Sequence, residues 1–177
     1  KKYTLTLFMY ILSNYLIFLQ LQQIFTMVKK MYSELKKVPH YHLIILLVIG
    51  NAIGFHCWHT LFNNFSIDTI GLDGSQVGLL QSIREIPGLL AFTIFIPLIF
   101  IKENHLAPIS ILLLGIGVTA TGIFKSFQGM ILTTMLMSIG FHYFETLSQS
   151  LALQHFSKKQ APFLFAQIRR TSSLCNV

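Results

Sequence analysis

Charged side chains are scarce in this chain. Only 11% of its 177 residues are Asp, Glu, Lys or Arg, and 6 of these are acidic. A soluble domain usually has about 25% charged residues. So few charges cannot cover the surface of a water-soluble protein of this size, whereas 53% hydrophobic residues and a mean hydropathy of +0.64 favour lipid as the surrounding solvent. The composition predicts an all-α, polytopic membrane helical bundle.

Cysteines and enzyme motifs are also scarce. Cys57 and Cys175 are the only cysteines, and their separation matches no disulfide or zinc framework. The net charge of +7 comes from short basic clusters between apolar runs, which argues against a nucleic-acid partner. We find no nucleophile elbow, phosphate loop or nucleotide fingerprint, so the sequence indicates no enzyme class and no cofactor.

Long apolar runs, in contrast, are abundant. A helix that spans a bilayer needs about 20 apolar residues. Four runs meet this requirement, and a fifth helix is predicted to begin near residue 163. The four predicted spans are 41–62, 76–101, 108–127 and 130–154. They define a domain over 41–177 whose main partner is the lipid bilayer.

The first 40 residues differ from this domain. The run 3–25 is apolar but carries several Ser, Asn and Gln side chains, and the first methionine after it that could start a chain is Met27. We therefore treat 1–26 as a separate hydrophobic segment, either upstream of the true start or an ordinary extra transmembrane helix. Residues 27–40 are rich in lysine and are predicted to be a basic cytoplasmic leader.

The basic residues also predict an orientation in the membrane. Lys and Arg concentrate in the leader, at Lys102 and in the tail, whereas the loop after the first span has only Asp68 and Asp73. Cytoplasmic loops carry an excess of Lys and Arg. We expect a multi-pass protein of the plasma (inner) membrane with its leader and tail in the cytoplasm.

The second predicted span carries two charges near its middle, in the sequence QVGLLQSIREIPGLLAF. Ionised groups within a bilayer usually face a protein interior or a water-filled cavity. Arg84 and Glu85 are followed at once by Pro87, which should kink the helix. We therefore expect Arg84 and Glu85 to line a cavity, unless Arg84 simply reaches Asp68 or Asp73 at the outer surface.

The fourth predicted span has a second polar stripe. Ser138, His142, Glu145 and Gln149 recur at helical spacing and share a face. Glu145 must be neutral, paired or hydrated within a membrane, and Arg84 is a candidate partner. A carboxyl group of this kind suits a proton-coupled carrier, and the alternative is a structural ion pair between two helices.

The first predicted span combines small residues with polar ones. Gly50 and Gly54 would let a neighbouring helix approach closely, and Asn51 between them either lines a cavity or bonds across that interface. His56 and His59 share a face and could hold a metal, although cavity lining is the commoner role for such a pair. The segment GIGVTATG at 115–122 predicts a tightly packed or cavity-lining third helix.

The order of these elements resembles the start of a major facilitator superfamily transporter. SQVGLLQSIREIPGLLAF is similar to its second helix, and the patterns REIPG and GFHYFET are typical of an uncharacterised bacterial branch. The resemblance runs from about Met27 to the C-terminus. The loop FIKENHLAP departs from the family, because it lacks the usual Gly and Asp-Arg pair.

The resemblance implies a fragment of a secondary active solute carrier. Such transporters have two six-helix halves, so the missing C-terminal helices of the same transporter would be partners, and this part alone would not transport. It implies that Arg84, Glu85, His142, Glu145, Gln149 and Asn51 line the path of a small solute, with protons as a candidate coupling ion. The alternatives are a non-transporting membrane subunit and a small metalloenzyme that uses His56, His59, His142, Glu145 and His155.

Overall fold

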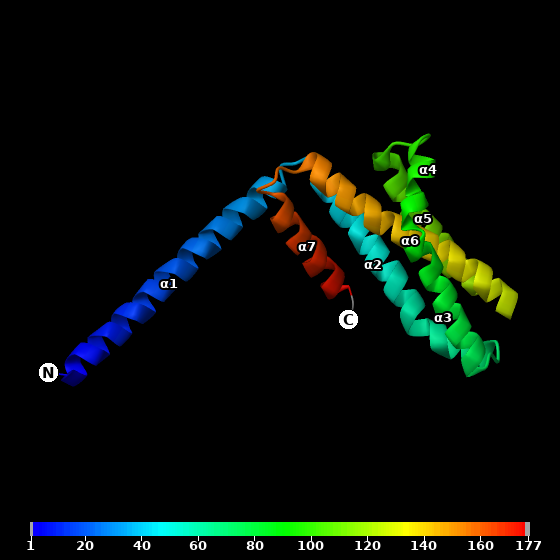
Figure 1. The fold of residues 1–177 in the computed structure, drawn as a ribbon, viewed down its shortest axis with the longest axis horizontal. Coiled ribbons are helices and arrows are strands. Elements are labelled where there is room, and N and C mark those ends of the chain that lie inside the picture. The colour runs from blue at the N-terminus through cyan, green and yellow to red at the C-terminus, as the bar shows by residue number, and fades with distance from the viewer. Residues whose placement is uncertain (1, 176–177) are drawn as a thin grey trace. The chain divides into compact units, whose positions relative to one another are not determined.

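The computed structural model describes the backbone of residues 2–175 and the side chains of residues 18–175 (Figure 1). Within this part of the chain every regular element is a helix, as the composition predicts. The chain divides into two compact units, residues 1–41 and residues 42–177. Each unit is described by itself.

The first unit is essentially one helix, α1 (Lys2–Leu35). The helix continues through Met27, so the predicted boundary between segments 1–26 and 27–40 does not coincide with a break. It ends shortly before Pro39, as expected because proline disfavours helical backbone at the residue that precedes it. Near this end Lys37 Nζ donates to Glu34 Oε1 at 2.7 Å, and this hydrogen bond together with the lysine charge lowers the pKa of Glu34.

The second unit begins with α2 (Tyr41–Asn64), which continues through a π-helical turn, η1 (Phe65–Thr69). Helix α3 (Gly74–Leu89) then starts at a capping box. The Gln76 backbone N–H donates to Asp73 Oδ1 at 2.8 Å, and the Asp73 backbone N–H donates to Gln76 Oε1 at 3.1 Å. These bonds satisfy two N–H groups that a helix start would otherwise leave unpaired.

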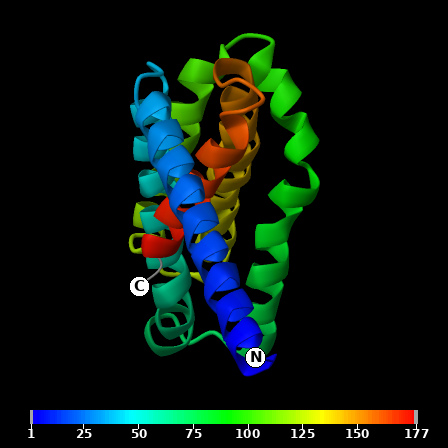
Figure 2. The same ribbon diagram turned by 90° about the vertical axis from the view of Figure 1, so that its left-hand side faces the viewer.

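The predicted second span, 76–101, is not one straight helix. After α3 the chain forms a 3-10 turn, η2 (Ala91–Ile94), and the short helix α4 (Phe95–Leu98). The two parts are bent by 53°, and the break is visible in green in Figure 2. The prediction of a kink is therefore right, but its position is not. Pro87 is accommodated within α3, and the bend follows at Leu90.

Two long antiparallel helices and one shorter helix complete the unit. Helix α5 (Glu103–Thr121) starts five residues earlier than predicted, with the acidic Glu103 at the positive end of its dipole. Helix α6 (Phe127–His155) matches the fourth predicted span closely and starts at a Ser126 cap. Helix α7 (Ala161–Leu174) corresponds to the helix expected near residue 163.

Glycines allow the long helices to approach closely. A Cβ on Gly117 of α5 would lie 2.4 Å from the Met137 backbone nitrogen of α6, and one on Gly140 would lie 2.5 Å from the Leu114 nitrogen. A Cβ on Gly54 of α2 would lie 2.3 Å from Leu114 Cδ2, so α2 also packs on α5. The predictions of close packing at Gly54 and within 115–122 are confirmed.

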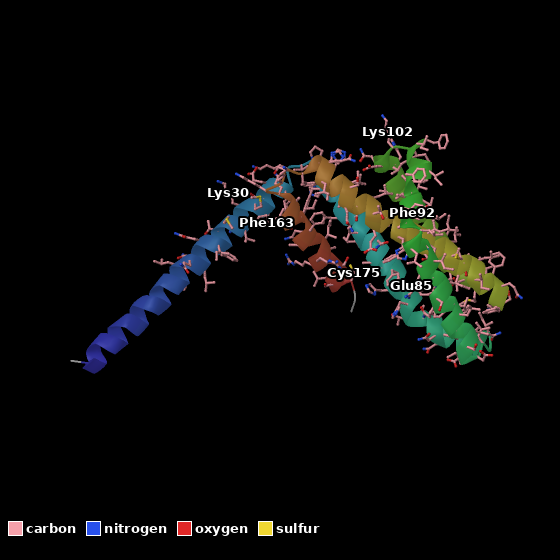
Figure 3. The ribbon with its side chains drawn as sticks, viewed as in Figure 1. Lys30, Glu85, Phe92, Lys102, Phe163 and Cys175 are labelled. Atoms are coloured by element: carbon pink, nitrogen blue, oxygen red, sulfur yellow. The ribbon has the colours of Figure 1, made fainter. Side chains whose placement is uncertain are left out.

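Two helical segments of the described chain are long and apolar enough to cross a membrane: Tyr41–Thr69 and Glu103–Thr121. The bent pair α3 and α4 makes a third if it counts as one span. The outer sides of these segments are apolar; Phe92, labelled in Figure 3, is 66% exposed. A fourth span through α6 stays a prediction, because α6 is not among the segments apolar enough.

Candidate functional site

The two charges of α3 pair with each other. Arg84 Nε donates to Glu85 Oε1 at 3.0 Å, and Arg84 Nη2 donates to the same oxygen. The Arg84 guanidinium also lies 5.9 Å from the ring centre of Phe55 and 5.7 Å from that of Trp58, both on α2. A cation over an aromatic face is stabilised by the negative charge density of the ring. Arg84 therefore faces α2 with its charge compensated.

This arrangement differs from the pairings considered for Arg84. Among the described residues the ion pairs do not join Arg84 to Asp68, to Asp73 or to Glu145. The physical reason is local, because Glu85 is the next residue and its carboxylate reaches the guanidinium without any movement of a neighbouring helix. The Glu85 side chain remains 55% exposed while that of Arg84 is 20% exposed, so Glu85 is the more accessible member of the pair.

The N-terminal members of the polar stripe on α6, Ser138 and His142, support the bent helix. Ser138 Oγ donates to the backbone carbonyl of Arg84, and the His142 ring lies against Gly88, where an added Cβ would be 2.7 Å from His142 Cε1. Thr93 of η2 and Tyr143 of α6 share a hydrogen bond of 2.9 Å between their hydroxyls. Polar side chains of α6 thus hold α3 and η2 on both sides of the bend.

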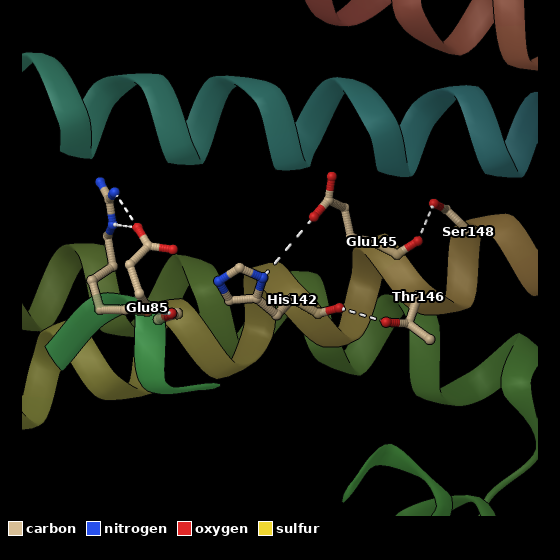
Figure 4. A network of polar contacts seen from close by, with 7 residues as sticks. Glu85, His142, Glu145, Thr146 and Ser148 are labelled. Carbon is tan, nitrogen blue, oxygen red and sulfur yellow. Dashed lines mark hydrogen bonds and ion pairs between the residues drawn. The ribbon is translucent and has the colours of Figure 1, made fainter. Parts of the chain in front are cut away.

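Glu145 lies one helical turn beyond His142. Its Oε2 is 4.0 Å from His142 Nδ1, and its side chain projects from α6 toward α2 in Figure 4. The neighbouring hydroxyls are used locally: Thr146 Oγ1 donates to the His142 carbonyl and Ser148 Oγ to the Glu145 carbonyl. The Glu145 side chain is 53% exposed within the described chain, so its carboxylate is open to a ligand or to water.

Helices α2, α6 and α7 line an open cavity of about 390 Å³ beside Glu145. Its polar lining comes from Asn51, Glu145, Gln149 and Arg169 together with two serines. The full lining is Val48, Asn51, Phe144, Glu145, Ser148, Gln149, Phe165, Ile168, Arg169 and Ser172. The Oδ1 atom of Asn51 is buried and has no hydrogen-bond partner among the described residues. A buried acceptor without a partner costs free energy, so Asn51 is a costly residue to place in this lining.

The six predicted site residues therefore fall into two neighbouring groups. Asn51, Glu145 and Gln149 line the larger cavity. Arg84, Glu85 and His142 instead line a small one of about 40 Å³, closed by Phe55, Met137, Ser138 and Phe141. The small cavity has room for about one water molecule. The contact between His142 and Glu145 connects the two groups.

Arg169 is the site residue that sequence reasoning missed. Its position next to Arg170 near the end of the chain suggested a topology signal. In the structure α7 places Phe165, Ile168, Arg169 and Ser172 on one face toward the cavity. These residues recur at i, i+3, i+4 and i+7, which is the signal that could have identified Arg169.

The histidines do not assemble a metal centre within the described residues. His56 and His59 both contact the Phe55 ring, at centroid distances of 5.7 and 6.0 Å, rather than a shared carboxylate or thiol. Within residues 18–175 no three His, Cys, Asp or Glu side chains lie close enough together to hold a metal ion. A second, mostly apolar cavity of about 420 Å³ lies between α2, η1 and α5, with Asp68 as its charged residue.

Comparison of the chain with protein-family models, with characterised proteins and with solved structures finds no match. Conclusions about its chemistry therefore depend on its own residues.

Proposed function

We propose that this chain supplies helices of a secondary active solute carrier, as its resemblance to the major facilitator superfamily implies. The observation that carries the proposal is the cavity between α2, α6 and α7, where Asn51, Glu145, Gln149 and Arg169 converge. Ionisable groups on helices within a membrane usually mark the path of a solute or an ion. The structural ion pair considered as the alternative, between Glu145 and Arg84, is not among the ion pairs of the described residues.

The proposed carrier has its leader and tail in the cytoplasm, as the distribution of Lys and Arg favours. Carriers of this class bind their solute near the middle of the bilayer, between two related halves. We propose that further helices complete the cavity on its open side. The chain supplies one wall of the path, with His142 and Glu85 extending the polar lining toward the other end of α6.

The first test is whether the cavity holds water within a membrane. In a Cys57→Ser/Cys175→Ser background, Asn51→Cys should react with a hydrophilic maleimide in membrane vesicles, whereas Ile53→Cys should not. The two positions lie on the same helix, two residues apart, but Ile53 is an outward-facing apolar residue with 50% exposure. A thiol in lipid stays protonated and is unreactive.

The comparison also shows how the proposal would fail. Equal labelling of both positions would place α2 in water, and labelling of neither position would mean that the cavity is closed to solvent. Either result contradicts a carrier. Where flux of a solute or of protons is observed in vesicles, Glu145→Gln and Arg84→Ala should each abolish it without preventing membrane insertion. Wild-type flux in either variant would remove that residue from the mechanism.

A further inference from the structure

The cavity between α2, α6 and α7 presents charges of both signs. Glu145 supplies a carboxylate from α6 and Arg169 supplies a guanidinium from α7. Among the described residues neither forms an ion pair with an oppositely charged Lys, Arg, Asp or Glu side chain; the ionisable neighbour of Glu145 is His142 at 4.0 Å. Both charges are therefore available to a bound molecule.

The side chains of Asn51, Glu145 and Arg169 lie at a similar depth. Asn51 is about 15 Å from the start of α2, Glu145 about 15 Å from the end of α6 and Arg169 about 12 Å from the start of α7, at 1.5 Å per residue. The end of α6 and the start of α7 are joined by the short segment 156–160, and α2 begins at the same end of the unit in Figures 1 and 2. The groups thus surround one layer of the cavity.

We infer that this cavity binds a small zwitterionic solute, with an ammonium group on Glu145 and a carboxylate on Arg169. The inference rests on the proposed carrier function and names its substrate class. A ligand with only a positive charge would leave the charge of Arg169 without a partner. A ligand with only a negative charge would leave that of Glu145 without one. A molecule with both charges satisfies the two side chains together, since charge-assisted hydrogen bonds are about twice as strong as neutral ones.

Asn51 adds a neutral polar group to the lining. Its side-chain amide belongs to the cavity lining, and an ammonium group has three donors, more than one carboxylate oxygen of Glu145 can accept. Phe144, Phe165 and Ile168 supply apolar surface for a short carbon chain between the charged groups. A volume of about 390 Å³ lies within the range of small-molecule sites, about 300–1,000 Å³, so a small solute fits this part of the cavity.

The test compares three probes with the purified chain in lipid nanodiscs: 4-aminobutanoate, butanoate and butylammonium. These probes have similar skeletons and differ in charge. We expect 4-aminobutanoate to bind at least tenfold more tightly than either singly charged probe in equilibrium titrations. A longer zwitterion, 6-aminohexanoate, covers the case in which the two charges lie farther apart. Binding of neither zwitterion, or equal binding of all probes, would overturn the inference.

Two variants test which side chain binds the ammonium group of the ligand and which binds its carboxylate. Glu145→Gln should remove the advantage of 4-aminobutanoate over butanoate, and Arg169→Gln should remove its advantage over butylammonium. Arg170→Gln is the matched control, because it makes the same change one residue farther along α7 but at a position outside the cavity lining. A preference for the zwitterion that survives both Glu145→Gln and Arg169→Gln would overturn the assignment.

Failure of this inference can be distinguished from failure of the carrier proposal. Cysteine labelling at Asn51 reports whether the cavity is hydrated, regardless of what binds there. If the labelling pattern agrees with a hydrated cavity but no zwitterion binds preferentially, the substrate class is wrong and the carrier proposal stands. If Asn51→Cys does not react, the carrier proposal fails first.

Discussion

Gly117 offers a sharp test of the packing that positions α6. A Cβ on Gly117 would lie 2.4 Å from the Met137 backbone nitrogen and 2.7 Å from its Cα. Backbone atoms cannot rotate away as a side chain can, so α5 and α6 must separate by about 1 Å to reach an ordinary contact of 3.4 Å. Overpacking of this kind typically costs about 1–3 kcal/mol. We expect Gly117→Ala to carry a steric cost of that size, which opposes the helix-propensity gain of alanine.

Gly115 provides the matched control, two residues away in the same helix. A Cβ on Gly115 meets no atom within 4 Å. Alanine is favoured over glycine in a helix by about 1 kcal/mol, and this gain applies to both variants. The difference between Gly117→Ala and Gly115→Ala, about 1–3 kcal/mol, therefore isolates the steric term.

The assay is equilibrium unfolding in mixed detergent micelles, followed by the fluorescence of Trp58. This residue is the single tryptophan of the chain and is 3% exposed, so its emission should respond to unfolding. If Gly117→Ala proves as stable as Gly115→Ala, α5 and α6 do not pack through Gly117. The alignment of α6 with α2 and α7 would then need revision too.

Two further predictions address hydrogen bonds outside the cavity. Tyr143→Phe should lower the free energy of unfolding by about 0.5–1.5 kcal/mol, because it removes the bond to Thr93, and should have no further effect in a Thr93→Val background; an equal loss in that background would contradict the bond. Lys37→Met should raise the pKa of Glu34 toward its ordinary value, as measured by NMR titration, because the lysine lowers that pKa in the folded chain. The Glu34–Lys37 contact is therefore present at neutral pH and lost as the pH falls through the lowered pKa, and an unchanged Glu34 titration in Lys37→Met would contradict it.

Much of the helical pattern could be predicted from the sequence. Long apolar runs separated by proline, glycine or charge identify α2 and α6 to within three residues, because helix formation over such runs is a local property. The predicted span 108–127 is displaced from α5, which runs from Glu103 to Thr121. The division of 76–101 could not be predicted in detail. Pro87 indicates a distortion, but the position of the bend also depends on bonds from α6, such as that between Tyr143 and Thr93.

The α6 stripe of the candidate site was predictable from the sequence, but its pairings were not. Helical spacing identifies Ser138, His142, Glu145 and Gln149 as one stripe, since residues three and four apart share a face. Spacing does not predict which residues of the other helices each member contacts. Pairing depends on the register between helices, and no local pattern fixes that register. Arg169 shows the same limit, because its role depends on how α7 returns beside α2 and α6.

The polar residues of the α6 stripe have two different roles, structural and ligand-binding, which helical spacing alone does not distinguish. Ser138 donates to the carbonyl of Arg84, three residues before Pro87, and His142 fills the space that Gly88 leaves. Pro87 removes the hydrogen bond to the carbonyl of Ile83, and the Ser138 bond to the next carbonyl ties α3 to α6 beside that gap. That end of the stripe stabilises the bent helix. Glu145 and Gln149 face open space instead, so only they can exchange a protein contact for a solute. Function should therefore be more sensitive to changes at Glu145 and Gln149, and folding to changes at Ser138.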